Sequence, residues 1–497
     1  MAEPKVNELM EKIVSLCKRR GFVFQSSEIY GGINGFWDYG PLGADLKRQV
    51  KDLWWQAMTR LRDDVVGLEA TIIMSPQIWK ASGHVDTFSD PMCDCLLTRK
   101  RFRADQIEPQ SGTVLHFAGA RDPRSDKVLE EPFAVLLPPG KPPESARKLA
   151  HEFYGTRGWN SVELLGERTE RVENTTRFNP ENGALLTEPR PFNLMLQTYV
   201  GPIQSEENVA YLRPETAQAI FAQFKNVLET SRQKVPFGIA QVGKAFRNEV
   251  TPRNFTFRSR EFEQMELEFF IPPDEVVEAI HGSVAELAGP GHPGEPQPNW
   301  GWKLWHQYWV EERVRFYEGI GLSRETLGFH TQTPEELAHY ARATTDILFK
   351  FPFSKRDAEG RVAGDELEGI AARSDFDLSQ HERFSGKPMG VFDEELRGAW
   401  ARLAPERQTA LRERYHQARL KYLTRTARSG DTPESIARKA QADADGLARG
   451  QYIPHVIEPS AGVDRLILAL IANAYHEETS TDDKGKTETR VVMRFHP

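Results

Sequence analysis

The 497-residue sequence has little of what marks a secreted, membrane-bound or strongly basic protein. Its three cysteines, Cys17, Cys93 and Cys95, are too few for a disulfide framework and indicate a reducing cytoplasm. No apolar run approaches the ~18 residues of a membrane span, and the charged N-terminus lacks the apolar segment of a secretory signal. The net charge of -8 gives no overall attraction to nucleic acid, so any RNA contact must come from a local basic patch.

Two further absences narrow the classes of site. Neither a GxGxxG nor a GxxxxGK(S/T) motif is present, which argues against a parallel nucleotide-binding sheet. Cys93 and Cys95 have no second pair nearby, whereas a structural zinc needs four ligands. The apolar content of 39% and charged content of 27% are those of a globular protein, and the length predicts more than one domain or one domain with insertions.

The most informative stretch is 237–270, which predicts two strands joined by a polar loop containing Pro252 and Asn254. In the return run, 257–270, period-two alternation puts Met265, Leu267 and Phe269 on one face. The opposite face carries Arg258, Arg260, Phe262, Gln264 and Glu266. Such a face suits a ligand with phosphates, a flat base and an ammonium group, because arginines grip phosphate, a ring stacks on a purine and a carboxylate pairs an amine. An ordinary hairpin with one solvated face is the alternative.

Several motifs in the same order resemble those of class II aminoacyl-tRNA synthetases. DYGPLG (38–43) before a long helix resembles motif 1, FRNE (246–249) begins motif 2, and EPSAGVDR (458–465) resembles motif 3. YLRPETAQ (211–218), REFEQMELEFF (260–270) and DFDL (375–378) are similar to sequence motifs of homodimeric glycyl-tRNA synthetases. The resemblance spans roughly residues 17–494 and implies an α+β fold, an antiparallel sheet flanked by helices and carrying insertions.

By this resemblance the chain would bind ATP and Mg²⁺, with Arg247, Glu249 and Arg465 as catalytic residues. Arg247 would hold the α-phosphate, Phe262 would stack the adenine, and Arg465 would brace the other side of the ring. Glu366 is the candidate ligand for Mg²⁺, an ion that prefers hard carboxylate oxygens. The implied ATP-binding residues are Arg247, Asn248, Glu249, Phe257, Arg258, Arg260, Phe262, Glu366, Leu367, Gly462, Asp464 and Arg465.

The resemblance also implies a pocket for glycine. Glycine has no side chain to recognise, so its pocket must bind the ammonium group and leave no room beside Cα. Glu215, Glu266, Glu458 and Ser460 would supply the acidic surroundings. The implied glycine-binding residues are Arg103, Glu215, Phe262, Gln264, Glu266, Glu458, Ser460 and Gly462. His84 is another candidate base or ligand, although a lone histidine is more often structural.

Changes in composition predict the domain organisation. The catalytic domain begins at 1–105, is interrupted by an insertion at 106–191, continues at 192–379 with motif 2, and ends at 451–497 with motif 3. A second insertion at 380–450 contains a helix predicted over 399–428, whose many basic residues make it a candidate for contact with RNA phosphates. A solvated basic helix explains that stretch nearly as well. A helix is also predicted over 463–476, packed on a central hairpin at 237–270.

The expected partners are glycine, tRNA(Gly) and a second copy of the chain. The family continues past motif 3 into an anticodon-binding domain, which this sequence does not show, so weak charging of tRNA or a separate anticodon-binding polypeptide is expected. Three rivals stay open: an adenylate-forming paralogue or split-enzyme subunit, a catalytically idle tRNA-binding subunit, and a nucleotide-binding module without glycine specificity. Arg247, Glu249, Phe262 and Arg465 argue against the idle subunit, and the acidic residues argue against the last rival.

Overall fold

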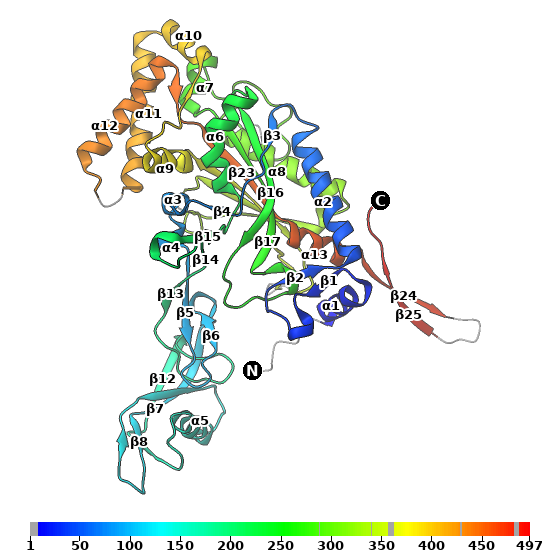
Figure 1. The fold of residues 1–497 in the computed structure, drawn as a ribbon, viewed down its shortest axis with the longest axis vertical. Helices are drawn as coiled ribbons and strands as arrows, with labels where there is room; N and C mark the ends of the chain where they lie inside the picture. Colours follow the sequence, from blue (N-terminus) through cyan, green and yellow to red (C-terminus); the bar gives the residue numbers. More distant parts are fainter. Residues whose placement is uncertain (1–7, 288, 339, 356–361, 428–429, 482–486) are drawn as a thin grey trace. The chain divides into compact units, whose positions relative to one another are not determined.

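The computed structural model describes residues 8–287, 289–338, 340–355, 362–427, 430–481 and 487–497. The chain forms two compact units, which Figure 1 draws as a ribbon. The first comprises Met1–His84, Met195–Arg247 and Pro252–Pro497, and the second comprises Val85–Leu194 and Asn248–Thr251. No described helix is both long enough and apolar enough to cross a membrane.

The first unit is built on a sheet of seven described strands, and all neighbouring pairs are antiparallel except the last. The predicted fold class is therefore confirmed. In spatial order the strands are β18 (Leu327–Thr331), β19 (Ala343–Phe349), β20 (Asp365–Ser374), β23 (His455–Gly462), β17 (Glu261–Ile271), β16 (Phe237–Phe246) and β3 (Val65–Gly67). The prediction that the hairpin of β16 and β17 lies centrally is wrong, because β23 occupies the middle and β16 is second from one edge.

The return strand of the hairpin is shorter than its alternating sequence predicts. Residues Phe255–Phe257 form a 3-10 turn, and β17 begins only at Glu261. Asn254 and Phe255 both adopt positive φ, which continues the turn that Pro252 begins. Arg258 and Arg260 therefore precede the strand instead of sharing a strand face with Phe262, Gln264 and Glu266.

Each face of the sheet packs against its own set of helices. Met265, Leu267 and Phe269 of β17 belong to one core cluster, together with side chains of α1 (Glu8–Arg20), α2 (Pro41–Thr59), α8 (Trp302–Gly319) and α13 (Val463–Ala474). Phe270 belongs to a second cluster with α6 (Ala217–Ser231), α7 (Asp274–His281), α9 (Phe376–Ser385) and α10 (Glu394–Arg402). Alternation along β17 thus separates an apolar face from a face that carries Gln264 and Glu266.

Helix α13 forms where the sequence predicts it, and it ends two residues before the predicted boundary. Its buried side chains recur at helical spacing and include Val463, Leu466, Ile467, Leu470, Ile471 and Ala474. This stripe packs on the face of β17 that bears Met265 and Leu267. The helix therefore holds Arg465, in its first turn, beside the end of β23.

The single basic helix predicted over 399–428 is in fact two helices. Helix α10 ends at Arg402, and α11 (Pro405–Arg425) begins after two extended residues, Leu403 and Ala404. Pro405 explains the break, because a proline ring disfavours helical geometry in the residue before it. Arg428 lies outside the described residues. Helix α12 (Pro433–Gly446) packs beside α11.

The second unit is a set of small antiparallel sheets around one helix, and it begins at Val85, ahead of the insertion predicted at 106–191. Phe133, Phe153 and Tyr154 lie in its apolar core, in which Cys93 and Cys95 are also buried. Its elements are β5 (Ser89–Asp94), β6 (Arg101–Arg103), β7 (Gln110–Phe117), β8 (Gly119–Arg121), β9 (Val128–Leu129), β10 (Phe133–Leu137), α5 (Pro143–Gly155), β11 (Glu163–Leu165), β12 (Arg168–Thr175) and β13 (Arg190–Asn193).

Short elements complete the chain. They are β1 (Val23–Gln25), β2 (Trp37–Tyr39), β4 (Ile73–Met74), α3 (Pro76–Ala81), α4 (His84–Thr87), β14 (Leu196–Tyr199), β15 (Val209–Leu212), β21 (Val391–Phe392), β22 (Gln451–Tyr452), β24 (Tyr475–Thr481) and β25 (Thr487–Met493). Strands β24 and β25 form an antiparallel hairpin after α13, near the C-terminus in Figure 1. The segment from β1 to the start of α2 brings the residues of motif 1 against the end of α1.

The start of α2 provides a test of this packing. A Cβ atom on Gly43 would lie 1.9 Å from the carbonyl oxygen of Phe22, so Gly43→Ala must push two backbone segments apart. We expect a loss of about 2 kcal/mol or more in the free energy of unfolding, measured with denaturant. In Gly398→Ala, the matched control, the nearest atom is the flexible end of Arg402 at 3.5 Å, and stability should be unchanged or slightly increased. Equal stability of the two variants would contradict the packing described.

Candidate active site

Arg247 follows β16 directly and is held over the aromatic ring of Phe262. Its Nε donates to the carbonyl oxygen of Pro214 at 3.1 Å, and its guanidinium carbon lies 5.4 Å from the ring centre of Phe262. The backbone N–H of Arg247 donates to the carbonyl oxygen of Arg260 at 2.9 Å, which closes the open end of the hairpin. The predicted phosphate-binding arginine and the predicted stacking ring are therefore neighbours.

Arg465 forms a second group with Phe257 and Glu366. Its guanidinium lies 4.5 Å from the ring centre of Phe257, and its Nη1 pairs with a carboxylate oxygen of Glu366 at 3.2 Å. The ring of Phe257 is supported in turn by the rings of Phe351 and Phe353. The side chain of Glu366 is half exposed (51%), so its carboxylate oxygens are accessible to an ion from solvent.

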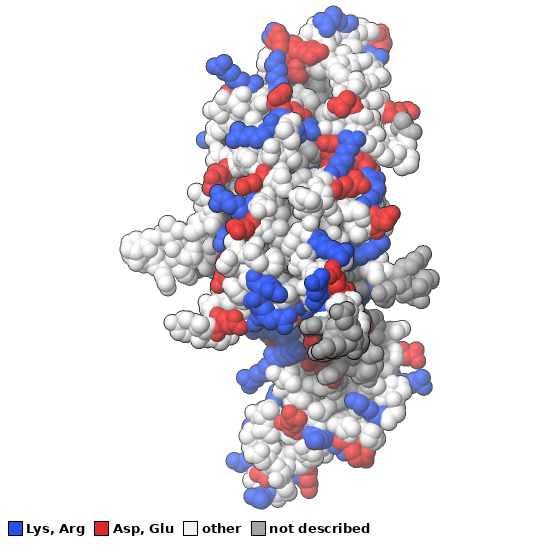
Figure 2. Space-filling model, turned by 90° about the vertical axis from the view of Figure 1, so that its right-hand side faces the viewer, with Lys and Arg blue, Asp and Glu red and all other residues white. Residues whose placement is uncertain are grey.

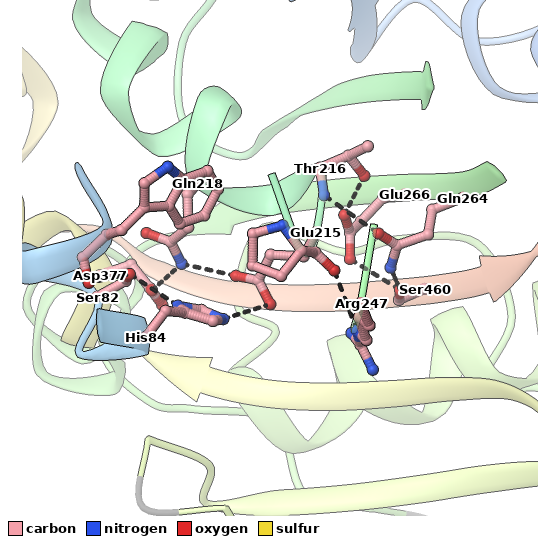
Figure 3. A network of polar contacts seen from close by, with 12 residues as sticks. Ser82, His84, Glu215, Thr216, Gln218, Arg247, Gln264, Glu266, Asp377 and Ser460 are labelled. Atoms are coloured by element: carbon pink, nitrogen blue, oxygen red, sulfur yellow. Dashed lines mark hydrogen bonds and ion pairs between the residues drawn. The ribbon is translucent and has the colours of Figure 1, made fainter. Parts of the chain in front are cut away.

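Glu266 is buried and held by two hydroxyl groups (Figure 3). The hydroxyl of Thr216, at the start of α6, donates to one carboxylate oxygen. Ser460 donates to the other at 2.8 Å, because the register of β17 with β23 places Glu266 opposite Ser460. Gln264 lies one pleat away and accepts from the backbone N–H of Thr216 at 3.2 Å. Burial and the neighbouring Glu215 raise the pKa of Glu266.

Glu215 lies next to this group and has an imidazole and an amide as partners. His84 Nε2 approaches its carboxylate at 3.2 Å, and the side-chain amide of Gln218 donates to it at 3.0 Å. Ser82 fixes the other ring nitrogen of His84 at 2.8 Å, as Figure 3 shows. Burial alone would raise the pKa of Glu215, but His84, Arg373 and Gln218 together hold it well below its usual range. His84, whose sequence context favours a structural role, is thus part of the network.

Sequence reasoning missed Arg373, which is the central cation of the site. Its Nη1 donates to both oxygens of Glu458 at 2.8 Å, and its Nε and Nη2 donate to Asp377 at 2.9 and 3.0 Å. The guanidinium carbon also lies 3.9 Å from the ring centre of Tyr340. Arg373 begins the segment RSDFDL (373–378), and the resemblance of this segment to the family was the signal that could have identified Arg373.

Glu268 is the second missed residue, although alternation along β17 places it on the same face as Glu266. Its side chain is completely buried (0% exposed), and neither of its oxygens has a hydrogen-bond partner among the described residues. Oxygen atoms of Glu266, Glu268 and Glu458 all lie within 4.8 Å of one another. Burial, and then repulsion from Glu458, raises the pKa of Glu268 well above its usual range. Burial and the carboxylates of Glu266 and Glu215 raise that of Glu458 to about 8, against the opposing charge of Arg373.

Two predicted ATP ligands, Asp464 and Leu367, have contacts within the fold. The carboxylate of Asp464 accepts hydrogen bonds from Tyr39 at 2.6 Å, from Lys47 at 2.8 Å and from the backbone N–H of Glu263 at 2.7 Å. These bonds join α13 to α2 and β17. Leu367 is 1% exposed within the apolar core. Gly462 pairs in register with Gln264 and precedes α13.

The remaining predicted residues separate into two groups. Arg260 donates to the carbonyl oxygen of Asn34 at 2.9 Å, and Arg258 pairs in an isolated bridge with Arg253. Arg103, Asn248 and Glu249 belong to the second unit. There Arg103 pairs with Asp90 at 2.9 Å and Asp105 at 2.7 Å, and the N–H of Asn248 donates to the carbonyl oxygen of Leu194 at 2.8 Å. Glu249 is buried.

Comparison with known proteins adds a family to this geometry. The profile of the family described as "tRNA synthetase class II core domain (G, H, P, S and T)" matches residues 200–288, which include α6 and the hairpin of β16 and β17. Among solved structures, a prolyl-tRNA synthetase of Giardia lamblia in complex with prolyl-adenylate aligns with a TM-score of 0.45 and 9% identity, covering 94% of this chain and 53% of that one. That likeness is too distant to carry an argument.

Curated relatives match almost the whole chain. A glycine–tRNA ligase of Rhodopirellula baltica is 40% identical over 507 residues, covering 98% of this chain and 81% of that protein. A glycine–tRNA ligase of Thermus thermophilus is 40% identical over 494 residues, covering 98% of this chain and 77% of that protein. That of Thermobifida fusca is 38% identical over 492 residues, covering 99% and 78%. By identity and coverage, therefore, the chain belongs to the glycine–tRNA ligase family of class II aminoacyl-tRNA synthetases.

Proposed function

We propose that this chain activates glycine with ATP to form glycyl-adenylate and transfers the glycyl group to tRNA(Gly). The observation that carries the proposal is Glu266, buried and held by Thr216 and Ser460, on the same strand face as Phe262, over which Arg247 lies. A carboxylate fixed in this way binds an ammonium group, while the arginine and the ring bind a phosphate and a purine. These are the three chemical groups that an aminoacyl-adenylate combines.

The pocket selects glycine by charge and by lack of space. Glu215, Glu266 and Glu458 surround the ammonium group, and Ser460 and Thr216 fix the position of Glu266. Steric exclusion then discriminates against larger amino acids, because an added side chain overfills a packed site. The acidic groups therefore supply the binding energy, and packing supplies the specificity.

Activation expels pyrophosphate, so the reaction needs charge neutralisation and in-line positioning more than covalent catalysis. Arg247 holds the α-phosphate and stabilises the charge that develops there. Phe262 stacks on the adenine, and Arg465, positioned by Phe257, braces its other side. Glu366 would hold Mg²⁺ on the phosphates, and its half-exposed carboxylate fits an ion that keeps most of its water and phosphate ligands. Bound Mg²⁺ would neutralise charge on the phosphates.

We further propose that the chain acts as a homodimer in the cytoplasm. Exposed apolar side chains occur before, within and just after the segment that resembles motif 1 and its helix α2. They are Ile29 and Tyr30, each 87% exposed, with Ile33, Leu42, Leu53 and Leu61. Exposed apolar side chains in such numbers are suited to burial against a second copy. The free and buried state of Cys17, Cys93 and Cys95 supports a reducing compartment.

The surface charges restrict where tRNA binds. Over most of the face in Figure 2, blue and red side chains are interspersed, in agreement with the net charge of -8. In α11, several of the basic residues that made it a candidate RNA contact are neutralised by acidic groups from other segments. Arg407 pairs with Glu278, Arg412 with Asp445, Arg414 with Glu275 and Glu278, and Arg419 with Asp375 and Asp443.

The last turns of α11 differ from the rest of the helix. Within the described part of the chain no ion pair involves Lys421, Arg425 or Arg342, and all three line a cavity of about 300 Å³. His455 and Tyr415 contribute to the same cavity. We therefore propose that tRNA phosphates bind at Lys421 and Arg425, and that the first turns of the helix serve the fold.

The proposed activation is tested by Arg247→Ala. Loss of this preorganised charge should lower the rate of glycine-dependent ATP–pyrophosphate exchange at least ~100-fold, which corresponds to roughly 3 kcal/mol in the activation free energy. Near-parental exchange by Arg247→Ala would contradict the role given to Arg247.

Glu266→Gln keeps the shape of its side chain but removes its charge. In the same exchange assay it should therefore raise the KM for glycine more than the KM for ATP.

The proposed RNA contact is tested by the double variant Lys421→Ala, Arg425→Ala. It should raise the KM for tRNA about tenfold. It should also reduce the salt dependence of tRNA binding, because fewer counterions are released from the RNA when fewer side chains contact its phosphates. Pyrophosphate exchange should be unchanged. Arg407→Ala is the matched control, since Arg407 is on the same helix but is paired with Glu278. Equal effects of the control and the double variant on tRNA binding would refute the assignment.

A further inference from the structure

The pocket that the proposed function assigns to the amino acid contains more buried acidic groups than cations. Five carboxyl groups meet there, those of Glu215, Glu266, Glu268, Asp377 and Glu458. Arg373 hydrogen-bonds to two of them, and the buried guanidinium of Arg213 is close enough to interact with Glu266. His84 adds at most one positive charge, at Glu215. Even with His84 protonated and Arg213 counted, five negative charges would face three positive ones. Burying uncompensated charge is so unfavourable that the carboxyl groups retain protons instead.

Hydrogen bonding shows which carboxyl groups hold the excess. Glu215 is satisfied by His84 and Gln218, and Glu266 by Thr216 and Ser460. Asp377 and Glu458 share the guanidinium of Arg373. Glu268 alone in this group has no hydrogen-bond partner among the described residues, and one of its oxygens lies within 4.8 Å of oxygens of Glu266 and Glu458.

We propose that Glu268 and Glu458 together hold one proton while the pocket is empty, and that the ammonium group of the incoming amino acid displaces this proton to solvent. The O–H bond of a carboxyl group breaks and the proton passes to the buffer. The three N–H bonds of the ammonium group stay intact. One positive charge therefore replaces another, and the net charge of the buried cluster is the same before and after binding.

The surroundings of the pair agree with this exchange. Burial, repulsion from Glu458 and the charges of Glu266 and Asp377 raise the pKa of Glu268. Burial and the charge of Glu266 raise the pKa of Glu458, and Arg373 opposes the rise for both groups. Glu215 adds to the effect on Glu458. The raised pKa values and the short distances between the oxygens of Glu266, Glu268 and Glu458 favour a proton held by the pair while the pocket is empty. An ammonium group beside Glu266 would favour the charged form of both carboxyl groups and so expel the proton.

The sign of the pH dependence follows directly. Because the protonated pocket must lose its proton before or as glycine binds, affinity for glycine should rise as pH increases from 6 toward 8. The limit for release of one proton is a tenfold change in affinity per pH unit. Above that range the amino group of free glycine loses its own proton, and affinity should fall again.

Calorimetric titration of the full chain with glycine tests the proposal. At pH 7 the observed enthalpy should differ between phosphate and Tris, whose ionisation enthalpies differ, by an amount corresponding to release of about half to one proton. Glu268→Gln preserves the shape of the side chain but removes one titrating group. Glycine binding to this variant should therefore release less than about half the number of protons released by the unmodified chain, and the affinity for glycine should depend less on pH. Glu261→Gln, on the opposite face of β17 and paired with exposed Lys244, is the matched control and should behave like the parent.

The outcomes separate this inference from the proposed function. If glycine neither binds nor supports exchange, the proposed function itself fails. If glycine binds with an enthalpy that is the same in both buffers, the function stands and the proton exchange is refuted. The proton exchange is also refuted if Glu268→Gln releases as many protons as the unmodified chain. It is refuted as well if the affinity for glycine depends on the concentration of sodium or potassium ions and not on pH, because a metal cation would then occupy the cluster.

Discussion

The fork of Arg373 between Glu458 and Asp377 is the interaction on which the candidate site depends. It joins β20, β23 and α9 through four hydrogen bonds, and its guanidinium is buried against Tyr340. A buried ion pair of this kind contributes little net stability, but removing one partner leaves an uncompensated charge and is strongly destabilising. The arrangement is therefore best understood as a device that permits several carboxyl groups to lie together in the interior.

The sheet register brings the polar side chains of the candidate site to one face of the sheet. Strand β23 lies between β20 and β17, so Glu458 and Ser460 face the residues of both neighbours. Ser460 lies opposite Glu266 and Gly462 opposite Gln264. A one-residue slip of β17 would turn Gln264 and Glu266 to the apolar face. The apolar face, filled by Met265, Leu267 and Phe269 under α8 and α13, thus fixes the position of the polar one.

Sequence reasoning was strongest where the signal was local. Period-two alternation placed Phe262, Gln264 and Glu266 together, and the structure has them on one face of β17. It failed for Arg258 and Arg260, because positive φ at Asn254 and Phe255 prolongs the turn. Non-local partners were out of reach: the acidic residues that neutralise α11 come from distant segments, as do the partners of Arg373 and His84. Glu268 was within reach, since the same alternation extends to it.

The central claim is that a buried, crowded acidic pocket selects glycine, and amino-acid-dependent ATP–pyrophosphate exchange tests it most directly. Parallel assays with glycine, alanine and serine should give kcat/KM values for alanine and serine at least roughly tenfold below that for glycine, because each added group must overfill the site. Serine should fare no better than alanine, since its hydroxyl does not relieve the crowding. Exchange that proceeds equally well with all three amino acids would contradict the account.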